Sequence, residues 1–415
     1  MKILVLNSGS SSQKCSLYEI GERLPEAPPI PLWQGTIEWR GDIEEIEVKN
    51  SYGAVERAKV HFSSRIETIR HLLGTLWQGE TRVIASAPEI DVVGHRVVHG
   101  GSKYEEPVLL TPEVKAEIGK VAGFAPLHNR AELEGMELIE KLLGLVPQVA
   151  VFDTGFHRKM PPAAAAYPGP YRWWESGIHR YGFHGINHQY CAARAAQLLG
   201  RDLDSLKLVT CHLGNGCSLA AIHQGHSVDT TMGFTPLEGL MMGTRSGSVD
   251  PGILTYIMRQ NQLRPEQIEE VLNKESGLLG ISGISGDMRE ILASAKGGHP
   301  RAKLAFDIYI HRLQAGIGSM VAVLGGIDAL VFTAGVGENS AEVRSATCSK
   351  LEFLGLKLDE TANAQRSADK DIATLDSPAR ILVIRAQEDW AIAAECWNLG
   401  RIESPLRPGI DKLGP

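Results

Sequence analysis

The sequence predicts an α/β protein built from two domains. Its 415 residues exceed what a single hydrophobic core usually holds, so two domains are the default expectation. Hydrophobic residues make up 43% of the chain and charged residues 22%, as in ordinary globular proteins. Short apolar runs typical of strands alternate with longer segments of helical spacing, and one hairpin pattern occurs twice, about 200 residues apart.

The repeated pattern consists of two short strands joined by a turn that contains asparagine and glycine. It covers residues 3–20 and again residues 208–222, and in both copies the second strand begins with Cys-Ser-Leu. We therefore predict two halves of related architecture. Glycines let the backbone N–H groups of such turns approach a phosphate, although ordinary hairpins with turn glycines are the alternative. The first turn also offers Asn7, which could reach a metal ion or its water, and the ammonium group of Lys14.

The composition argues against several classes of protein. The formal net charge of −7 does not suit nucleic-acid binding, which requires a basic face. The most apolar long segment, residues 320–337, contains Asp328, and the four apolar residues after Lys2 are too few for a signal peptide. The six cysteines lack metal-ligand spacing and are expected to be reduced, mostly buried thiols. We therefore expect a cytoplasmic protein with neither nucleic acid nor a membrane as its partner.

Three further segments have the composition of phosphate-binding or nucleotide-binding loops. Residues 243–247 place Arg245 between small residues, where its guanidinium could reach an anion. Residues 335–339 follow a buried strand and open a helix with Gly-x-Gly, an arrangement that binds phosphate. A glycine- and serine-rich loop enters another helix at Asp287, which could cap that helix or hold a ribose or adenine edge. Together these loops indicate a nucleotide site.

Four other polar residues lie at positions that suit a catalytic site. Arg96 lies in a strand that ends in a double glycine, so it could bind an anion in a cleft or form a structural ion pair. Asp153 and Glu388 each follow an apolar strand, where α/β enzymes place catalytic or metal-binding carboxylates. Capping of a helix is the competing use of Asp153. His184 precedes a helix and could face a phosphate, although a lone histidine often has a structural role.

Seven short motifs of the chain resemble those of the acetate kinases, in the order in which that family has them. They are residues 7–14 (NxGSSSxK), 94–101 (GHRVVHGG), 152–154 (FDT), 181–185 (YGFHG), 212–216 (HLGNG), 243–247 (GTRSG) and 335–339 (GVGEN). The first, fifth and sixth motifs are the most specific, and the resemblance that the seven motifs carry extends over nearly the whole chain.

This resemblance implies a duplicated actin-like fold, related to ribonuclease H and the sugar kinases, with the active site in the cleft between two domains. The first domain would comprise residues 1–154 completed by 388–415, and the second, which binds the nucleotide, residues 155–387. The implied reaction is the reversible transfer of a phosphoryl group from ATP to acetate, giving ADP and acetyl phosphate. The family uses Mg²⁺, which Mn²⁺ could replace, and is usually homodimeric.

Carried over residue by residue, the resemblance also implies a role for each site residue. The catalytic residues would be Asp153, His184 and Arg245. The acid would be bound by Arg96, in a small apolar pocket formed by Val98, Leu127, Phe183 and Pro236. The metal would lie near Asn7 and Glu388. The nucleotide and its phosphates would contact Lys14, His212, Leu213, Gly214, Asn215, Gly216, Asp287, Met288, Arg289, Gly335, Val336, Gly337, Glu338 and Asn339.

The chemistry of phosphoryl transfer explains these residue types. The reaction needs positioning and charge neutralisation rather than covalent help from the protein. Two anionic reactants must meet, and Arg96, Arg245, Lys14 and the metal ion supply compensating positive charge. Because a carboxylate substrate is already ionised at about pH 7, Asp153 need not remove a proton. Orienting an arginine or metal-bound water explains Asp153 equally well.

Some positions depart from the family pattern, and other functions stay open. Ser248 stands where aspartate is commoner, and residues 385–387 differ from the usual approach to Glu388. We interpret residues 158–180 as a connection that crosses from one half to the other, and its part 158–178 is atypical. A propionate or butyrate kinase of the same fold is the nearest alternative, because one methylene discriminates by only about 1–3 kcal/mol. An actin-like nucleotide-binding or ATPase module is the alternative from another class. Such a module would not need Arg96, Asp153, His184 and Arg245 together.

Overall fold

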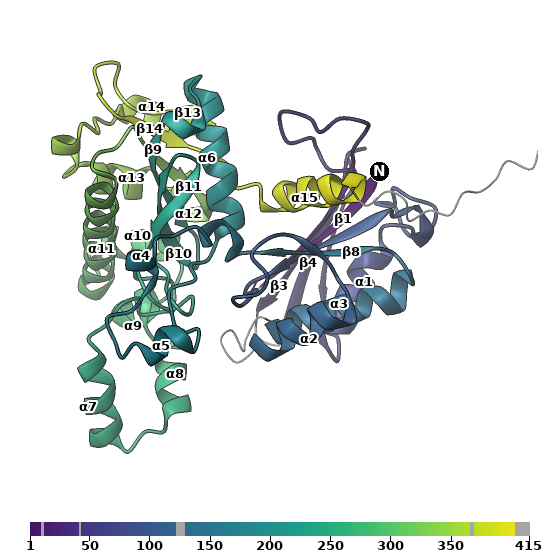
Figure 1. Cartoon of the computed structure of the whole chain (residues 1–415), viewed down its shortest axis with the longest axis horizontal. Helices are drawn as coiled ribbons and strands as arrows, with labels where there is room; N and C mark the ends of the chain where they lie inside the picture. The colour runs from purple at the N-terminus through teal and green to yellow at the C-terminus, as the bar shows by residue number, and fades with distance from the viewer. Residues whose placement is uncertain (10–11, 41–42, 122–128, 366–368, 403–415) are drawn as a thin grey trace, which may run out of the picture. The chain divides into compact units, whose positions relative to one another are not determined.

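The computed structural model describes residues 1–9, 12–40, 43–121, 129–365 and 369–402. The chain divides into two compact units, one formed by Met1–Gly155 with the residues from Gln387 onward, and the other by Phe156–Ala386 (Figure 1). Each unit is built around its own β-sheet. No helix in the described part of the chain is both long and apolar enough to span a membrane. All six cysteines are buried free thiols.

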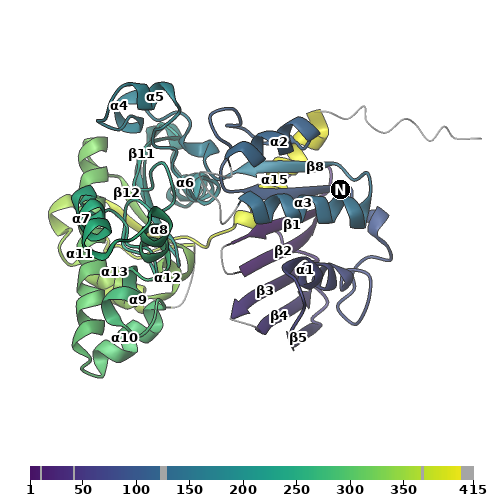
Figure 2. The ribbon, with the colours of Figure 1, turned by 90° about the horizontal axis from the view of Figure 1, so that it is seen from below.

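The first unit contains an eight-stranded sheet with the strand order β5-β4-β3-β2-β1-β6-β8-β7. Its strands are β1 (Lys2–Ser8), β2 (Ser12–Glu19), β3 (Trp33–Arg40), β4 (Ile43–Asn50), β5 (Val55–Val60), β6 (Val92–Val97), β7 (Val108–Leu109) and β8 (Gln148–Phe152). The first five form an antiparallel meander, which Figure 2 shows in order, whereas β6 and β8 run parallel to β1.

Helices cover both faces of this first sheet. α15 (Glu388–Ile402) packs on one face over β1 and β6, and α1 (Arg65–Gly74) and α3 (Asn129–Leu143) pack on the other, with α2 (Pro112–Lys120) against α3 (Figure 1). This arrangement explains why five consecutive residues of β1, Ile3 to Asn7, are all buried, since a strand covered on both faces has no solvent side.

The second unit contains a six-stranded sheet with the order β11-β10-β9-β12-β14-β13. Its strands are β9 (Lys207–Leu213), β10 (Cys217–His223), β11 (His226–Thr230), β12 (Ala329–Thr333), β13 (Lys370–Asp371) and β14 (Arg380–Val383). Helices α6 (Gly185–Leu199) and α11 (Pro300–Leu324) pack against this sheet. The remaining helices are α4 (Pro162–Ala165), α5 (Arg172–Glu175), α7 (Pro251–Asn261), α8 (Pro265–Lys274), α9 (Gly277–Ser282), α10 (Met288–Lys296), α12 (Ala334–Asn339), α13 (Ala341–Cys348) and α14 (Glu360–Ala364).

The two sheets share one topology. Strands β3-β2-β1-β6-β8 of the first sheet correspond in order and direction to β11-β10-β9-β12-β14 of the second, with an antiparallel meander followed by two parallel strands. The twice-used hairpin of the sequence therefore opens both sheets, and the predicted duplicated α/β fold is confirmed. Because the carboxyl ends of parallel strands lie at one edge of a sheet, this edge collects side chains from distant parts of each unit.

Two local predictions need correction. Residues 158–180 belong to the second unit rather than crossing between halves, because Arg180 donates to the backbone carbonyls of Thr230, Thr231 and Met232. The Gly-x-Gly segment expected at residues 335–339 as a loop before a helix is itself helical, as most of α12, and Ser340 separates it from α13. Ser340 caps α13 by accepting a hydrogen bond from the N–H of Val343.

The packing of β6 against α15 requires glycine at position 94. A Cβ atom there would lie 2.6 Å from Sγ of Cys396 and 2.7 Å from Cγ2 of Ile392. We expect Gly94→Ala to lower the free energy of unfolding by about 1–3 kcal/mol, as overpacking does, measured by urea titration. Gly74→Ala is the matched control, since a Cβ at Gly74 meets no atom within 4 Å. An equal loss of stability in both variants would contradict this account.

Candidate active site

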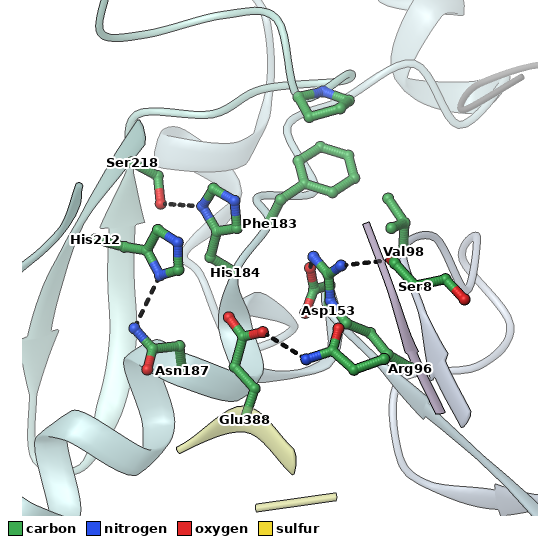
Figure 3. Close-up of polar contacts among 12 residues, drawn as sticks. Ser8, Arg96, Val98, Asp153, Phe183, His184, Asn187, His212, Ser218 and Glu388 are labelled. Atoms are coloured by element: carbon green, nitrogen blue, oxygen red, sulfur yellow. Dashed lines mark hydrogen bonds and ion pairs between the residues drawn. The ribbon is translucent and has the colours of Figure 1, made fainter. Parts of the chain in front are cut away.

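Arg96 lies on β6 and is anchored on two sides. Its Nη1 donates to the carbonyl oxygen of Ser8 at 3.0 Å (Figure 3), and its Nη2 donates to the carboxylate of Asp153, just after β8. The side chains are only 11% and 1% exposed. Burial disfavours the charged form, but the negative charges of Asp153 and Glu388 outweigh it and raise the pKa of Arg96 above its ordinary value. The guanidinium therefore stays charged, in a buried ion pair with Asp153.

A buried carboxyl group that the sequence analysis missed lies beside this pair. Glu132, in the first turn of α3, is 3% exposed, and both of its oxygens accept from the N–H of Val98 at 3.2 Å. Burial raises its pKa to about 8, against the opposing effects of the Arg96 charge and the hydrogen bond from Val98. Glu132 therefore holds the backbone of a predicted pocket residue, mainly in its protonated form. In the sequence it resembles any acid on the solvent face of a helix.

The predicted metal residues Asn7 and Glu388 lie together at the end of β1 and the start of α15. Nδ2 of Asn7 donates to Oε2 of Glu388 at 3.0 Å and to Oδ1 of Asp389 at 2.9 Å, and Ser16 donates to Oδ2 of Asp389 at 2.7 Å. Two adjacent carboxylates oriented by an amide and a hydroxyl are hard oxygen ligands of the kind that Mg²⁺ prefers. Asp389 is a second residue that the sequence analysis missed, although it directly follows Glu388.

The other two predicted site residues of the first unit are Lys14 and Leu127. Lys14 is exposed on β2, directly opposite Asn7 in the strand register. Leu127 lies outside the described residues, as do Ser10 and Ser11 of the first motif.

In the second unit the carboxyl edge of the sheet brings two predicted nucleotide loops together. His212 of β9 pairs in register with Thr333 of β12, so residues 212–216 and the start of α12 are neighbours. A Cβ atom at Gly214 would lie 3.7 Å from Nε2 of His212 and 3.9 Å from Cβ of Ala334. The loop 335–339 forms most of α12, where Glu338 accepts from the N–H of Ala386 at 2.8 Å.

His184 and Arg245 lie around Gly216 in the same unit. A Cβ atom at Gly216 would be 3.4 Å from Nε2 of His184 and 3.5 Å from Nη1 of Arg245. His184 has a φ of 57°, the left-handed conformation that residues with a side chain rarely adopt, and it is the N-cap residue of α6. Its ring stacks on that of His212, with centroids 3.9 Å apart and planes 9° apart. Two predicted catalytic residues are thus close to the predicted phosphate loop.

The remaining predicted site residues of the second unit include buried side chains and a helix cap. Phe183 is buried, and Pro236 accepts from Nη1 of Arg245 at 2.9 Å. Asp287 caps α10 by accepting from the N–H of Arg289 at 2.8 Å, and the Arg289 side chain folds back onto the same carboxylate. Met288 is buried, so its side chain serves the core. The turn before Asp287 is close to residues 243–247, since a Cβ at Gly286 would lie 2.9 Å from the carbonyl oxygen of Gly243.

Comparison with known proteins identifies the family. Residues 2–394 match the model of the acetokinase family. The chain belongs to the acetokinase family. A Cyanothece protein named acetate kinase is 61% identical over 401 residues, which are 96% of this chain and 98% of that protein. An acetate kinase from Gloeobacter violaceus is 59% identical over 402 residues, 96% of this chain and 99% of that protein.

Solved structures of acetokinases have the same fold. The crystal structure of Porphyromonas gingivalis acetate kinase matches with a TM-score of 0.86 at 41% identity, covering 96% of this chain and 99% of that one. A propionate kinase from Francisella tularensis also matches with a TM-score of 0.86, at 37% identity, covering 95% and 98%. The predicted enzyme class, a phosphotransferase, is therefore confirmed.

The buried Glu132 makes stability depend on pH. Its folded pKa of about 8 lies above that of an unfolded glutamate, so the folded form binds more protons, and stability is lost as pH rises toward the folded pKa. Glu132→Gln keeps the bond from Val98 without this ionisation. As pH rises from about 5 to about 8, we expect the free energy of unfolding of Glu132→Gln to increase by about 2–4 kcal/mol relative to that of the parent protein. Urea titration at several pH values measures this difference. Glu137→Gln, on the exposed face of α3, is the control, and an equal gain there would contradict the assignment.

Proposed function

We propose that the chain catalyses the reversible, Mg²⁺-dependent transfer of a phosphoryl group from ATP to acetate, giving ADP and acetyl phosphate. The observation that carries the proposal is the buried ion pair of Arg96 and Asp153, in a chain 61% identical to a protein named acetate kinase. A buried guanidinium of fixed charge suits a small carboxylate, which it can bind through charge-assisted hydrogen bonds. An actin-like module that only bound nucleotide would not need this pair.

Arg96 has capacity for a further anion. Its Nη1 and Nη2 are occupied by Ser8 and Asp153, but its Nε is buried and has no hydrogen-bond partner among the described residues. Burying such a donor is costly unless a ligand satisfies it. In the proposed reaction, the acid carboxylate is bound by Arg96, and its methyl group contacts Val98.

Asp153 acts by orientation in this proposal. Acetate is ionised at about pH 7, so its oxygen attacks without losing a proton. The bond of Asp153 to Nη2 fixes the plane of the Arg96 guanidinium and therefore the direction from which the acid approaches. Such positioning is a major source of rate in phosphoryl transfer.

His184 and Arg245 stabilise the transferred group. In phosphoryl transfer, negative charge is spread over the three equatorial oxygens, and donors preorganised around them lower the barrier. Both side chains approach the same glycine, Gly216, which leaves room for those oxygens because it has no side chain. The neighbouring loops at 212–216 and 335–339 supply backbone N–H groups for the nucleotide phosphates.

A magnesium ion fits the carboxylates of the first unit. Mg²⁺ usually keeps several waters and is bound through one or two carboxylates plus substrate phosphates. Glu388 and Asp389, oriented by Asn7, provide such a pair. When bound, the ion neutralises phosphate charge. The part of the chain that the structure describes has no cluster of three or more His, Cys, Asp or Glu side chains suited to a metal, and an ion held by phosphate and water does not need one.

A longer acid is the second candidate. It is supported by the 37% identity to a protein named propionate kinase. Resemblance to the family further supports a homodimer that acts in the cytoplasm, which sedimentation and fractionation would test.

The first test of the proposal is direct assay. We expect ATP formation from acetyl phosphate and ADP with Mg²⁺, and acyl phosphate formation with acetate preferred over propionate and butyrate. Because one methylene changes binding by only about 1–3 kcal/mol, the ranking should be compared as kcat/KM. A preference for propionate or butyrate would keep the mechanism and change the substrate. No transfer in either direction, with nucleotide still bound, would contradict the proposal.

Substitution of Arg96 tests the acid site. We expect Arg96→Ala to lower kcat/KM for acetate by about 100-fold or more, because a charged hydrogen-bonded anchor is lost, while nucleotide affinity stays unchanged. Arg57→Ala, which removes an exposed arginine of the same unit, is the matched control. Because Arg96→Ala leaves Asp153 buried without its partner, the double variant Arg96→Ala/Asp153→Ala must show the same kinetic loss. Unchanged turnover in a folded variant would remove Arg96 from the site.

A further inference from the structure

A chain of buried polar side chains leads from His184 into the core of the second unit. Nδ1 of His184 lies 2.8 Å from Oγ of Ser218, whose oxygen also lies 2.7 Å from Nε2 of His188 (Figure 3 shows the first of these contacts). Nδ1 of His188 then lies 2.7 Å from Oγ1 of Thr210. Ser218, His188 and Thr210 are completely buried. Sequence analysis assigned no role to any of the three.

We propose that Ser218, His188 and Thr210 form a hydrogen-bond relay that positions His184 so that its Nε2, the atom nearest Gly216, faces the transferred phosphoryl group. Nε2 has an N–H when the relay donates to Nδ1 of a neutral His184, and also when His184 is protonated. The inference rests on the proposed phosphotransfer and adds three positioning residues to it.

The stacked ring of His212 fixes the plane of His184, and the relay fixes its rotation. His212 is itself held by Asn187, whose Nδ2 donates to Nδ1 of His212 at 2.8 Å (Figure 3). With the plane and Nδ1 both constrained, Nε2 is directed toward Gly216 and Arg245. These contacts also counter the unfavourable left-handed backbone of His184.

The relay has two possible hydrogen-bond arrangements, because His188 is neutral. Burial, together with the neighbouring His157 and His212, lowers the pKa of His188 well below its usual value, so His188 is neutral and has one N–H. In the first arrangement, Thr210 donates to Nδ1 of His188, Nε2 of His188 donates to Ser218, and Ser218 donates to Nδ1 of a neutral His184. The hydrogen of His184 is then on Nε2.

The second arrangement reverses all three hydrogen bonds. Nδ1 of His184 donates to Ser218, Ser218 donates to Nε2 of His188, and Nδ1 of His188 donates to Thr210. A protonated His184 requires this arrangement and still has an N–H on Nε2. All three contacts of the relay are therefore kept whether His184 is neutral or protonated.

A serine occupies the corresponding hairpin position in both halves of the fold. Ser16 and Ser218 are the serines of the two Cys-Ser-Leu segments, one on β2 and the other on β10. Ser16 orients Asp389 beside the proposed metal site, as Ser218 orients His184. The duplicated hairpin thus places a hydroxyl behind a functional side chain in each unit, which supports a positioning role for Ser218.

Ser218→Ala tests the relay through kinetics and through His184 itself. We expect kcat to fall about 10- to 100-fold, as for the loss of a buried hydrogen bond, with KM for ATP and acetate little changed and the pH profile of kcat shifted. The ¹⁵N chemical shifts of the His184 ring should change in the free protein. Ser377→Ala is the matched control, because Ser377 is also buried in the second unit and, among the described residues, its hydroxyl bonds to backbone groups: it accepts from the N–H of Lys357 and donates to the carbonyls of Gly355 and Ala379.

The readouts separate the relay from the proposed function. Unchanged ¹⁵N shifts of His184 in Ser218→Ala, or equal losses of kcat in Ser218→Ala and Ser377→Ala, would overturn the relay. Absence of phosphoryl transfer in the parent protein, with the His184 shifts still dependent on Ser218, would overturn the proposed function and keep the hydrogen-bond relay. His188→Gln, which keeps an amide near Ser218, should retain more activity than His188→Leu; equal activity would contradict the role of His188.

Discussion

The parallel alignment of three strands in each sheet is the constraint on which the candidate site depends. Parallel strands end at one edge, so residues far apart in sequence become neighbours there without any local signal between them. In the first unit this edge holds Asn7 near the end of β1, Arg96 on β6 and Asp153 after β8. In the second unit it holds His212 at the end of β9 and Thr333 at the end of β12.

Burial gives these polar groups their properties. The Arg96–Asp153 pair is almost completely removed from water, and such a pair is tolerated only when each charge has partners. Ser8 and the neighbouring carboxylates provide those partners, and the result is a cation whose charge does not vary with pH. Glu132, which accepts from the N–H of Val98, shows the opposite outcome, because burial outweighs that hydrogen bond and the Arg96 charge and raises its pKa to about 8.

Duplication of the fold explains why both units use the same hairpin to position polar side chains. Each uses the first hairpin to present a polar turn and a serine on the return strand. The first unit pairs these parts with carboxylates from α15, which suits a cation, and the second pairs them with histidines from α6, which suits a phosphoryl group. The same hairpin scaffold therefore supports a cation-binding arrangement in one unit and an anion-binding arrangement in the other.

Much of this protein can be predicted from its sequence alone. The spacing of apolar residues predicts the main strands and helices, and the glycine-rich turns predict phosphate loops, because both signals are local. Motifs around Arg96, His184 and Gly216 are sufficient to indicate the family. Only the tertiary structure shows that Asp389 bonds to Asn7, that Glu132 lies buried behind Val98, and that Ser218 and His188 support His184. Those contacts join residues on different elements, and the ionisation of a side chain depends on the atoms that surround it in the fold rather than on its neighbours in the chain.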